Sequence, residues 1–169
     1  MNNFYTHIYA GDGKGKTSAA VGLAVRAAGS GKKVVFAQFF KGTDSGEISI
    51  LKQFVTVIRL PKSYGFWKTL TEYEKKELTK EHNIILQNAV SIKSDVLILD
   101  EIISAYNYQA VDTSKVDALL EEKPQFREII LTGRNPSSKL IGYSDYFSEI
   151  CDIKHVFAKG IKAREGIEY

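Results

Sequence analysis

Residues 10–18 read AGDGKGKTS, a glycine-rich loop that carries two lysines and ends on two hydroxyl side chains. The apolar run at 4–9 before the loop predicts a strand, and the alanine-rich segment at 17–28 predicts a helix. Strand, glycine loop and helix in this order are typical of a phosphate-binding loop. The glycines allow successive backbone N–H groups to turn toward an anion, and the helix start adds unpaired N–H groups. The stretch therefore predicts a site for a nucleoside triphosphate.

Three side chains of the loop have chemistry that suits this site. Lys16 supplies a mobile positive charge for the outer phosphates, and the Thr17 hydroxyl is placed to bind Mg²⁺. Lys14 adds a cation that fits a polyphosphate better than a plain turn. The first position of the pattern is relaxed, because Ala10 stands where the strict pattern has glycine. A glycine-rich turn that only caps the following helix is the alternative.

Length and composition predict one domain that spans residues 1–169. Hydrophobic residues make up 44% of the chain and charged residues 25%, which is close to the average for globular proteins. The net charge of +3 is too small for a dedicated nucleic-acid-binding protein. Cys151 is the single cysteine, and no segment resembles a signal peptide or a membrane span. We therefore expect a cytoplasmic protein with no nucleic-acid or membrane partner.

Apolar runs that predict strands alternate with segments that predict helices. The predicted strands are 4–9, 34–40, 55–60, 95–101 and 128–134, and the predicted helices are 17–28, 47–54, 71–92 and 112–122. This alternation predicts an α/β fold with a mostly parallel sheet of five to six strands and helices on both faces. Thr71 and Glu74 resemble a helix-capping start, whereas residues 143–154 mix helix and strand signals and carry no prediction.

The carboxyl ends of parallel strands meet at one edge, which here collects several charged residues. Asp100 and Glu101 end one predicted strand, and both are candidates to hold Mg²⁺ beside the phosphate loop. An acidic pair that merely closes a strand is the alternative, and the residues alone do not decide which acid touches the metal. Arg134 ends another strand and either clamps phosphate oxygens or pairs with a surface acid. Gln38 and Lys41 have the same two possibilities.

The three histidines, by contrast, have no metal-ligand spacing, so we interpret each of them as structural. They are His7, His82 and His155.

Several blocks in order resemble the phosphate-loop class of ATP:corrinoid adenosyltransferases over nearly the whole chain. The blocks are 11–17, 26–32, 38–42, 99–101, 131–134, 154–157, 160–163 and 166–168. The resemblance implies the P-loop NTPase (RecA-like) fold. It also implies a reaction in adenosylcobalamin synthesis or salvage, in which a cobalt(I) corrinoid attacks the 5′ carbon of ATP and triphosphate leaves.

Matching positions in the family assign roles to residues of this chain. The nucleotide-binding residues are Gly11, Asp12, Gly13, Lys14, Gly15, Lys16, Thr17, Ser18 and Arg134. Lys16 and Glu101 are implied to be catalytic, and Glu101 is favoured over Asp100 as the partner of Thr17 at the metal. The family implies ATP as co-substrate with Mg²⁺, a homodimer, and a reduced flavin or flavoprotein as electron donor. Two other functions remain as alternatives to adenosyl transfer: a nucleoside-kinase-like phosphotransferase and an ATP-binding motor module.

The aromatic pair Phe66 and Trp67 corresponds to a family element that crowds the lower face of the corrin ring. In the family these aromatics displace the lower axial ligand and make reduction of cobalt(II) easier. They are usually spaced Phe-x-Trp, whereas here they are adjacent. A hydrophobic plug that packs the loop onto the sheet is the alternative. The chain also begins almost at its first strand, so from the resemblance we expect it to lack an extension that covers the corrinoid in some members.

Overall fold

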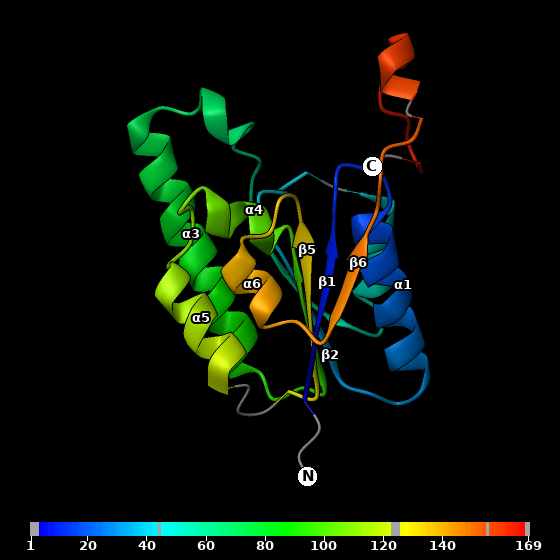
Figure 1. The fold of residues 1–169 in the computed structure, drawn as a ribbon, viewed down its shortest axis with the longest axis vertical. Coiled ribbons are helices and arrows are strands. Elements are labelled where there is room, and N and C mark those ends of the chain that lie inside the picture. Colours follow the sequence, from blue (N-terminus) through cyan, green and yellow to red (C-terminus); the bar gives the residue numbers. More distant parts are fainter. Residues whose placement is uncertain (1–3, 44, 123–125, 155, 168–169) are drawn as a thin grey trace.

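The computed structural model describes residues 4–43, 45–122, 126–154 and 156–167. Figure 1 shows a single sheet with helices on both of its faces. The sheet has six strands in the order β3-β2-β4-β5-β1-β6, and every neighbouring pair is parallel. The strands are β1 Tyr5–Ala10, β2 Val34–Gln38, β3 Thr56–Arg59, β4 Val96–Asp100, β5 Glu128–Gly133 and β6 Tyr146–Glu149. The predicted fold class is confirmed.

The helices divide between the two faces of the sheet. They are α1 Lys16–Gly29, α2 Gly46–Leu51, α3 Glu72–Ser91, α4 Ile102–Asn107, α5 Thr113–Glu122 and α6 Ser138–Gly142, with 3-10 turns at Trp67–Thr69 and Val156–Lys159. One core packs α1 and α2 on the sheet through small side chains such as Ala20 and Ala24. The other core packs α3, α4, α5 and α6 on the opposite face (Figure 1). None of the described helices combines the length and apolar character needed to cross a membrane.

The central strands match their prediction because they are buried on both faces. All five residues of β2 and all five of β4 are buried, and such strands appear in a sequence as continuous apolar runs. The capping start of α3 is also confirmed. The Thr71 hydroxyl accepts from the Glu74 backbone N–H, and the Glu74 carboxylate accepts from the Thr71 backbone N–H.

Four predicted strands extend one or two residues too far at their carboxyl ends, and for two of them the backbone shows the reason. The prediction continued through Phe40 and through Glu101, but both residues have left-handed backbone angles, with φ of 61° and 65°. A residue in this conformation cannot continue a strand, so β2 ends at Gln38 and β4 ends at Asp100. Both corrections fall at the edge of the sheet where the charged residues collect.

Three short elements were absent from the prediction. Helices α4 and α6 have six and five residues, too few for a helical period to be visible. Strand β6 is an edge strand whose four residues are all exposed, so it lacks the apolar run of a central strand. It lies inside the segment 143–154 and pairs with β1 alone.

Candidate functional site

A cavity of about 730 Å³ lies at the carboxyl edge of the sheet. The loop between β1 and α1 forms one wall, and the segment after β2 and the ends of β4 and β5 form others. Its lining includes residues 12–18, Lys41, Glu47, Glu101, Arg134 and Ile167. The structure thus brings together most of the residues that the sequence assigned to the nucleotide. Gly11 and Asp100 are outside this lining.

The phosphate loop is held from behind by the chain that leaves β6. The Gly13 N–H donates to the Ile150 carbonyl at 2.7 Å, and the Ile150 N–H donates to the Ala10 carbonyl at 2.8 Å. A Cβ atom on Gly13 would lie 2.7 Å from the carbonyl oxygens of Ile150 and Cys151. Glycine is therefore required at this position by the close approach of the two backbones. No pattern in the sequence predicted this contact.

The helix start at the loop is suited to an anion. Gly15 caps α1 with a φ of 120°, and no acidic residue lies in the first turn of the helix. The unpaired N–H groups and the positive end of the helix dipole are therefore not neutralised by an acid within the helix.

Lys16 lies among other cations. Its Nζ donates to the Gly13 carbonyl at 2.6 Å. Burial lowers the pKa of the Lys16 ammonium below its ordinary value, and the Arg134 guanidinium lowers it further, while Glu101 and Asp12 oppose this shift. An entering polyphosphate would relieve this unfavourable electrostatic environment.

Arg134 reaches the phosphate loop from the end of β5. Its Nη1 lies 3.2 Å from Asp12 Oδ1, and both side chains are more than half exposed. The main chain at this point is held by Asn107, whose Nδ2 donates to the carbonyls of Arg134 and Asn135 at 3.1 and 2.9 Å. Arg134 therefore pairs with an acid, as one of the two possibilities stated, and it also lines the cavity; its contact with phosphate stays a prediction.

Asp100 is a fully buried carboxylate that four neighbouring side chains satisfy. Oδ1 accepts from Thr17 at 2.9 Å and from Thr132 at 2.7 Å. Oδ2 accepts from Gln38 at 3.1 Å and from Lys41 at 3.2 Å. A buried charge is tolerated when it is paired and fully hydrogen-bonded, as here. Asp100 therefore fixes the Thr17 hydroxyl from below the cavity.

Glu101 stands in a different position from its neighbour, because it lines the cavity itself. Its backbone N–H donates to Thr132 Oγ1 at 2.8 Å, which holds the left-handed conformation. Its Oε1 accepts from Ser104 Oγ at 2.5 Å, which orients the carboxylate at the start of α4. Because of the left-handed turn at Glu101, the carboxylate of Asp100 is buried and that of Glu101 lies in the cavity wall.

The residues beside Thr17 fit a hard cation. Among the described side chains, no three His, Cys, Asp or Glu come together to hold a metal ion. Mg²⁺ needs no such cage, because it binds through one or two protein oxygens, water and substrate phosphates. The Lys41 ammonium lies 3.0 Å from Thr17 Oγ1 and 3.2 Å from Asp100 Oδ2, so a positive charge is already attracted to these oxygens.

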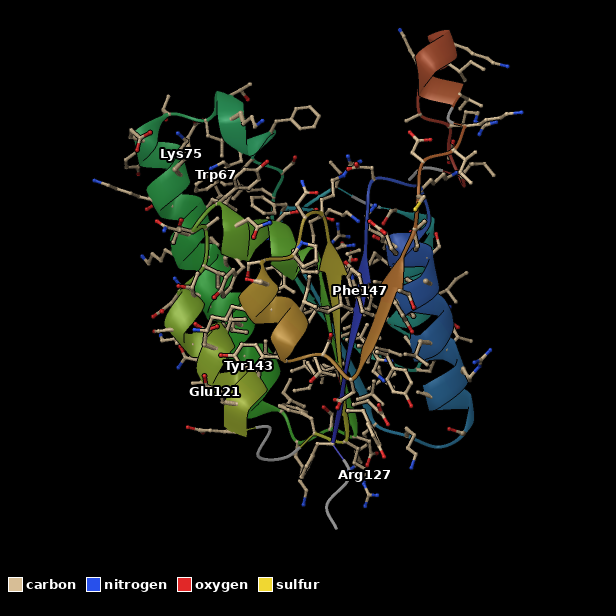
Figure 2. The ribbon with its side chains drawn as sticks, in the orientation of Figure 1. Trp67, Lys75, Glu121, Arg127, Tyr143 and Phe147 are labelled. Carbon is tan, nitrogen blue, oxygen red and sulfur yellow. The ribbon has the colours of Figure 1, made fainter. Side chains whose placement is uncertain are left out.

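The aromatic loop lies beyond this edge, at the N-terminal end of α3. Figure 2 shows Trp67 beside Lys75, whose Nζ is 5.8 Å from the indole centroid. The Trp67 ring stacks with Tyr108 at 6.0 Å and 19°, and it meets the Phe40 ring edge-on at 6.1 Å. The neighbouring Phe66 is 85% exposed. Trp67 therefore packs against neighbouring aromatic rings, as the alternative reading of this loop expects. Phe66 remains exposed to solvent.

Phe40 and Tyr108 were missing from the sequence interpretation of this surface. Phe40 was included in a predicted strand, and Tyr108 follows a helix that was not predicted. Their grouping depends on which loops the sheet order brings together. His82, interpreted as structural, lies behind Phe40 within 4.7 Å between ring centroids. His155 lies outside the described residues.

A family model described as "ATP:corrinoid adenosyltransferase BtuR/CobO/CobP" matches residues 2–169. The chain belongs to this family. The corrinoid adenosyltransferase of Escherichia coli K12 is 33% identical over 167 residues, which cover 96% of this chain and 84% of that protein. The corrinoid adenosyltransferase of Pseudomonas aeruginosa PAO1 is 30% identical over 168 residues, covering 96% and 82%. That of a Sinorhizobium species is 34% identical over 169 residues, covering 94% and 77%.

Membership of the corrinoid adenosyltransferase family confirms the resemblance inferred from the sequence. ATP as co-substrate fits the family, and the phosphate loop supplies the cationic cavity that a triphosphate requires. No observation favours a kinase or a motor module.

Proposed function

We propose that this chain moves the 5′-deoxyadenosyl group of ATP to the cobalt(I) of a corrinoid. The observation that carries the proposal is the family match over residues 2–169. In the reaction the cobalt electron pair forms a bond to the 5′ carbon. The bond from that carbon to oxygen breaks, and triphosphate leaves with its electron pair. The protein must therefore stabilise negative charge that grows on the triphosphate.

The residues proposed to bind the triphosphate are those of the loop from Gly11 to Ser18, together with Arg134. The cavity geometry supports this assignment, because Lys14, Lys16 and Arg134 all line it. Lys16 is proposed as the main catalytic cation, since it lines the cavity, and burial and the neighbouring Arg134 guanidinium lower the pKa of its ammonium. An ammonium in such a partly buried position interacts more strongly with developing charge than one in water.

Thr17 and Glu101 are proposed to hold Mg²⁺, with Asp100 acting through Thr17. Two observations support this division of roles: Glu101 lines the cavity, and Asp100 is fully buried with its hydrogen bonds satisfied. When bound, the ion would neutralise part of the charge on the leaving triphosphate. Glu101 is proposed as a catalytic residue on the same grounds, and Ser104 keeps its carboxylate oriented.

Phe66 and Trp67 are proposed to contact the corrinoid. The exposed Phe66 and the half-buried Trp67 lie on loops at the same edge of the sheet as the cavity. A large, flat, apolar ring is well matched by aromatic side chains that present faces and edges to it. We also propose, from the family alone, a homodimer in the cytoplasm that receives electrons from a reduced flavin or flavoprotein.

The test is a product assay with ATP, Mg²⁺ and chemically reduced cobalamin or cobinamide. We expect a cobalt–carbon bond in the absorption spectrum and one triphosphate for each adenosylated corrinoid. ADP and phosphate as the only products would refute the proposal. Lys16→Ala should lower the rate by about a hundredfold or more. Lys139→Ala is the matched control, because this exposed lysine pairs with Asp117 on α5 and is absent from the cavity lining.

A further inference from the structure

Phe40 has a backbone conformation that its own side chain does not favour. Its φ is 61°, in the left-handed region that non-glycine residues seldom adopt. Such a conformation persists only where the surrounding structure holds it. The Phe40 N–H donates to His82 Nε2 at 3.0 Å, which is the contact that holds it here.

His82 makes two hydrogen bonds of opposite sense from the middle of α3. Its Nδ1 lies 2.9 Å from the Ala110 carbonyl, which can only accept, so Nδ1 donates and Nε2 is free to accept from Phe40. The side chain is fully buried. Burial lowers the pKa of His82 to about 4, so the imidazole is neutral and this arrangement is maintained near neutral pH. His82 therefore joins α3 to the segment after β2 and to the segment after α4.

Phe40 and Lys41 are consecutive in the chain, but their side chains contact different parts of the structure. The Phe40 ring meets Trp67 at 6.1 Å and Tyr108 at 6.3 Å, edge-on in both cases. The next side chain, Lys41, reaches Thr17 and Asp100 at the floor of the nucleotide cavity. One turn of the main chain thus sets an aromatic surface on one side and a cationic contact on the other.

We propose that His82 is a positioning residue for both substrates, because its bond to the Phe40 N–H fixes the turn from which Phe40 and Lys41 project. In this arrangement the ring of Phe40 supports the corrinoid-facing Trp67, and the ammonium of Lys41 stands beside Thr17. The inference rests on the proposed function where it takes the Trp67 surface as the corrinoid side. Its nucleotide side rests on the contacts of Lys41 with Thr17 and Asp100.

A simple core role for His82 makes a different prediction. A buried side chain that only fills space would affect stability and leave substrate constants unchanged once the protein is folded. A positioning residue changes those constants in folded protein, and it is rescued by a side chain that keeps the acceptor for the Phe40 N–H. The distinction can therefore be measured.

The experiment compares His82→Leu, which removes the acceptor, with His82→Gln, whose amide oxygen can accept from Phe40 and whose amide N–H can donate to Ala110. Val116→Ala is the control, since Val116 is fully buried on α5 and makes none of these contacts. The readouts are the dissociation constant of ATP by calorimetry, the KM for cobalamin, and the emission maximum of Trp67, the single tryptophan.

In His82→Leu we expect ATP binding to weaken by about tenfold, the KM for cobalamin to rise by a similar factor, and Trp67 emission to shift to longer wavelength. His82→Gln should recover most of each change, and Val116→Ala should show none. If His82→Leu does not fold, His82→Met takes its place, because a thioether is only a weak acceptor for the Phe40 N–H. Altered constants in His82→Met that His82→Gln recovers support the inference, and constants equal to those of the wild type overturn it. Unchanged constants and emission in folded His82→Leu would also overturn it.

Failure of the proposed function is a separate outcome. A wild-type protein that forms no cobalt–carbon bond would refute the function. The ATP dissociation constant and the Trp67 emission need no turnover, so they still test the role of His82 in that case.

Discussion

The ammonium of Lys41 lies 3.2 Å from the carboxylate of Asp100, which is fully buried at the end of β4. Lys41 comes from the segment after β2, the strand that pairs with β4. The same ammonium is 3.0 Å from the Thr17 hydroxyl at the start of α1. This pairing therefore connects three elements of the nucleotide cavity, and it supplies a positive charge close to the proposed Mg²⁺ ligands.

Lys41→Met should destabilise the protein and make its stability depend on magnesium. Removing the cation leaves Asp100 buried with one partner fewer, so we expect the free energy of unfolding to fall by about 2 kcal/mol. ATP with Mg²⁺ should restore more stability to this variant than to the wild type, because the ion supplies charge at the same oxygens. Urea denaturation with and without the ligands measures both effects.

Lys115→Met is the control for Lys41→Met. Lys115 pairs with Asp112 at 4.0 Å, and its side chain is 60% exposed, so its loss should change stability by less than about 0.5 kcal/mol. Equal losses in the two variants would show that the buried carboxylate does not depend on Lys41.

Trp67→Ala should slow the reaction that starts from cobalt(II) corrinoid more than the reaction that starts from prereduced cobalt(I). The reason is the role that we propose for these aromatics by resemblance to the family, in which they would lower the barrier to reduction by removing an axial ligand from cobalt. We expect a difference of about tenfold between the two assays. Stopped-flow absorption spectra of the corrinoid in each assay give the rates.

Phe66→Ala separates ligand contact from packing in the same assays. The Phe66 side chain is 85% exposed, so its removal costs little stability, and any loss of rate reports on the corrinoid. Trp67 packs against Phe40 and Tyr108, and equal losses from cobalt(II) and cobalt(I) in Trp67→Ala would assign it a packing role only.

His82 should make the protein less stable as the pH falls from 6.5 to 4. Its folded pKa is about 4, below the ordinary value of 6.5, so in this window the unfolded chain binds a proton more readily than the folded chain. The contribution is fully present above pH 6.5, is lost as the pH falls toward 4, and amounts to about 3 kcal/mol in total.

Denaturant unfolding at several pH values tests this, with His82→Gln as the reference because it keeps two hydrogen-bonding groups and cannot titrate. The carboxylates titrate in both proteins, so the difference between them isolates the imidazole. Parallel pH curves for the two proteins would show that His82 is protonated equally in both states.

Gly13→Ala should impair both ATP binding and stability. The new methyl group would lie 2.7 Å from the carbonyl oxygens of Ile150 and Cys151, so the chain leaving β6 must move away from the phosphate loop. We expect ATP affinity to fall by about tenfold or more, with a lower melting temperature. Calorimetry and thermal unfolding measure the two quantities.

Gly29→Ala is the matched control for Gly13→Ala. Gly29 ends α1, is exposed, and has open space around its would-be Cβ atom. Alanine there should raise stability by about 0.5 kcal/mol and leave ATP binding unchanged. Loss of ATP affinity in this variant too would mean that the effect at Gly13 is not local.

The sequence was sufficient for the central strands and for the phosphate loop. Runs such as 96–99 are apolar on both faces because both faces are covered, and this leaves a direct mark in the sequence. The glycines and Lys16 are similarly local, since one short loop builds the anion site. Edge strand β6 and the short helices α4 and α6 left no such mark, because exposed or very short elements impose little pattern.

The residues at the sheet edge show where local information ends. Asp100 and Glu101 are neighbours with the same charge, and nothing in their order says that one is buried and the other lines a cavity. That difference follows from the left-handed turn at Glu101, which Thr132 on the neighbouring strand stabilises. The same applies to Phe40, whose conformation depends on an imidazole that lies 42 positions further along the chain.

The sequence by itself determined the parallel α/β fold, the phosphate loop and the family, because these depend on periodic burial and on residues that are adjacent in the chain. Only the tertiary structure decided which acid faces the cavity, which aromatic side chain is exposed and which histidine supports the edge of the site. These outcomes depend on hydrogen bonds and ring contacts between segments far apart in the chain, which form only when the sheet brings their ends together.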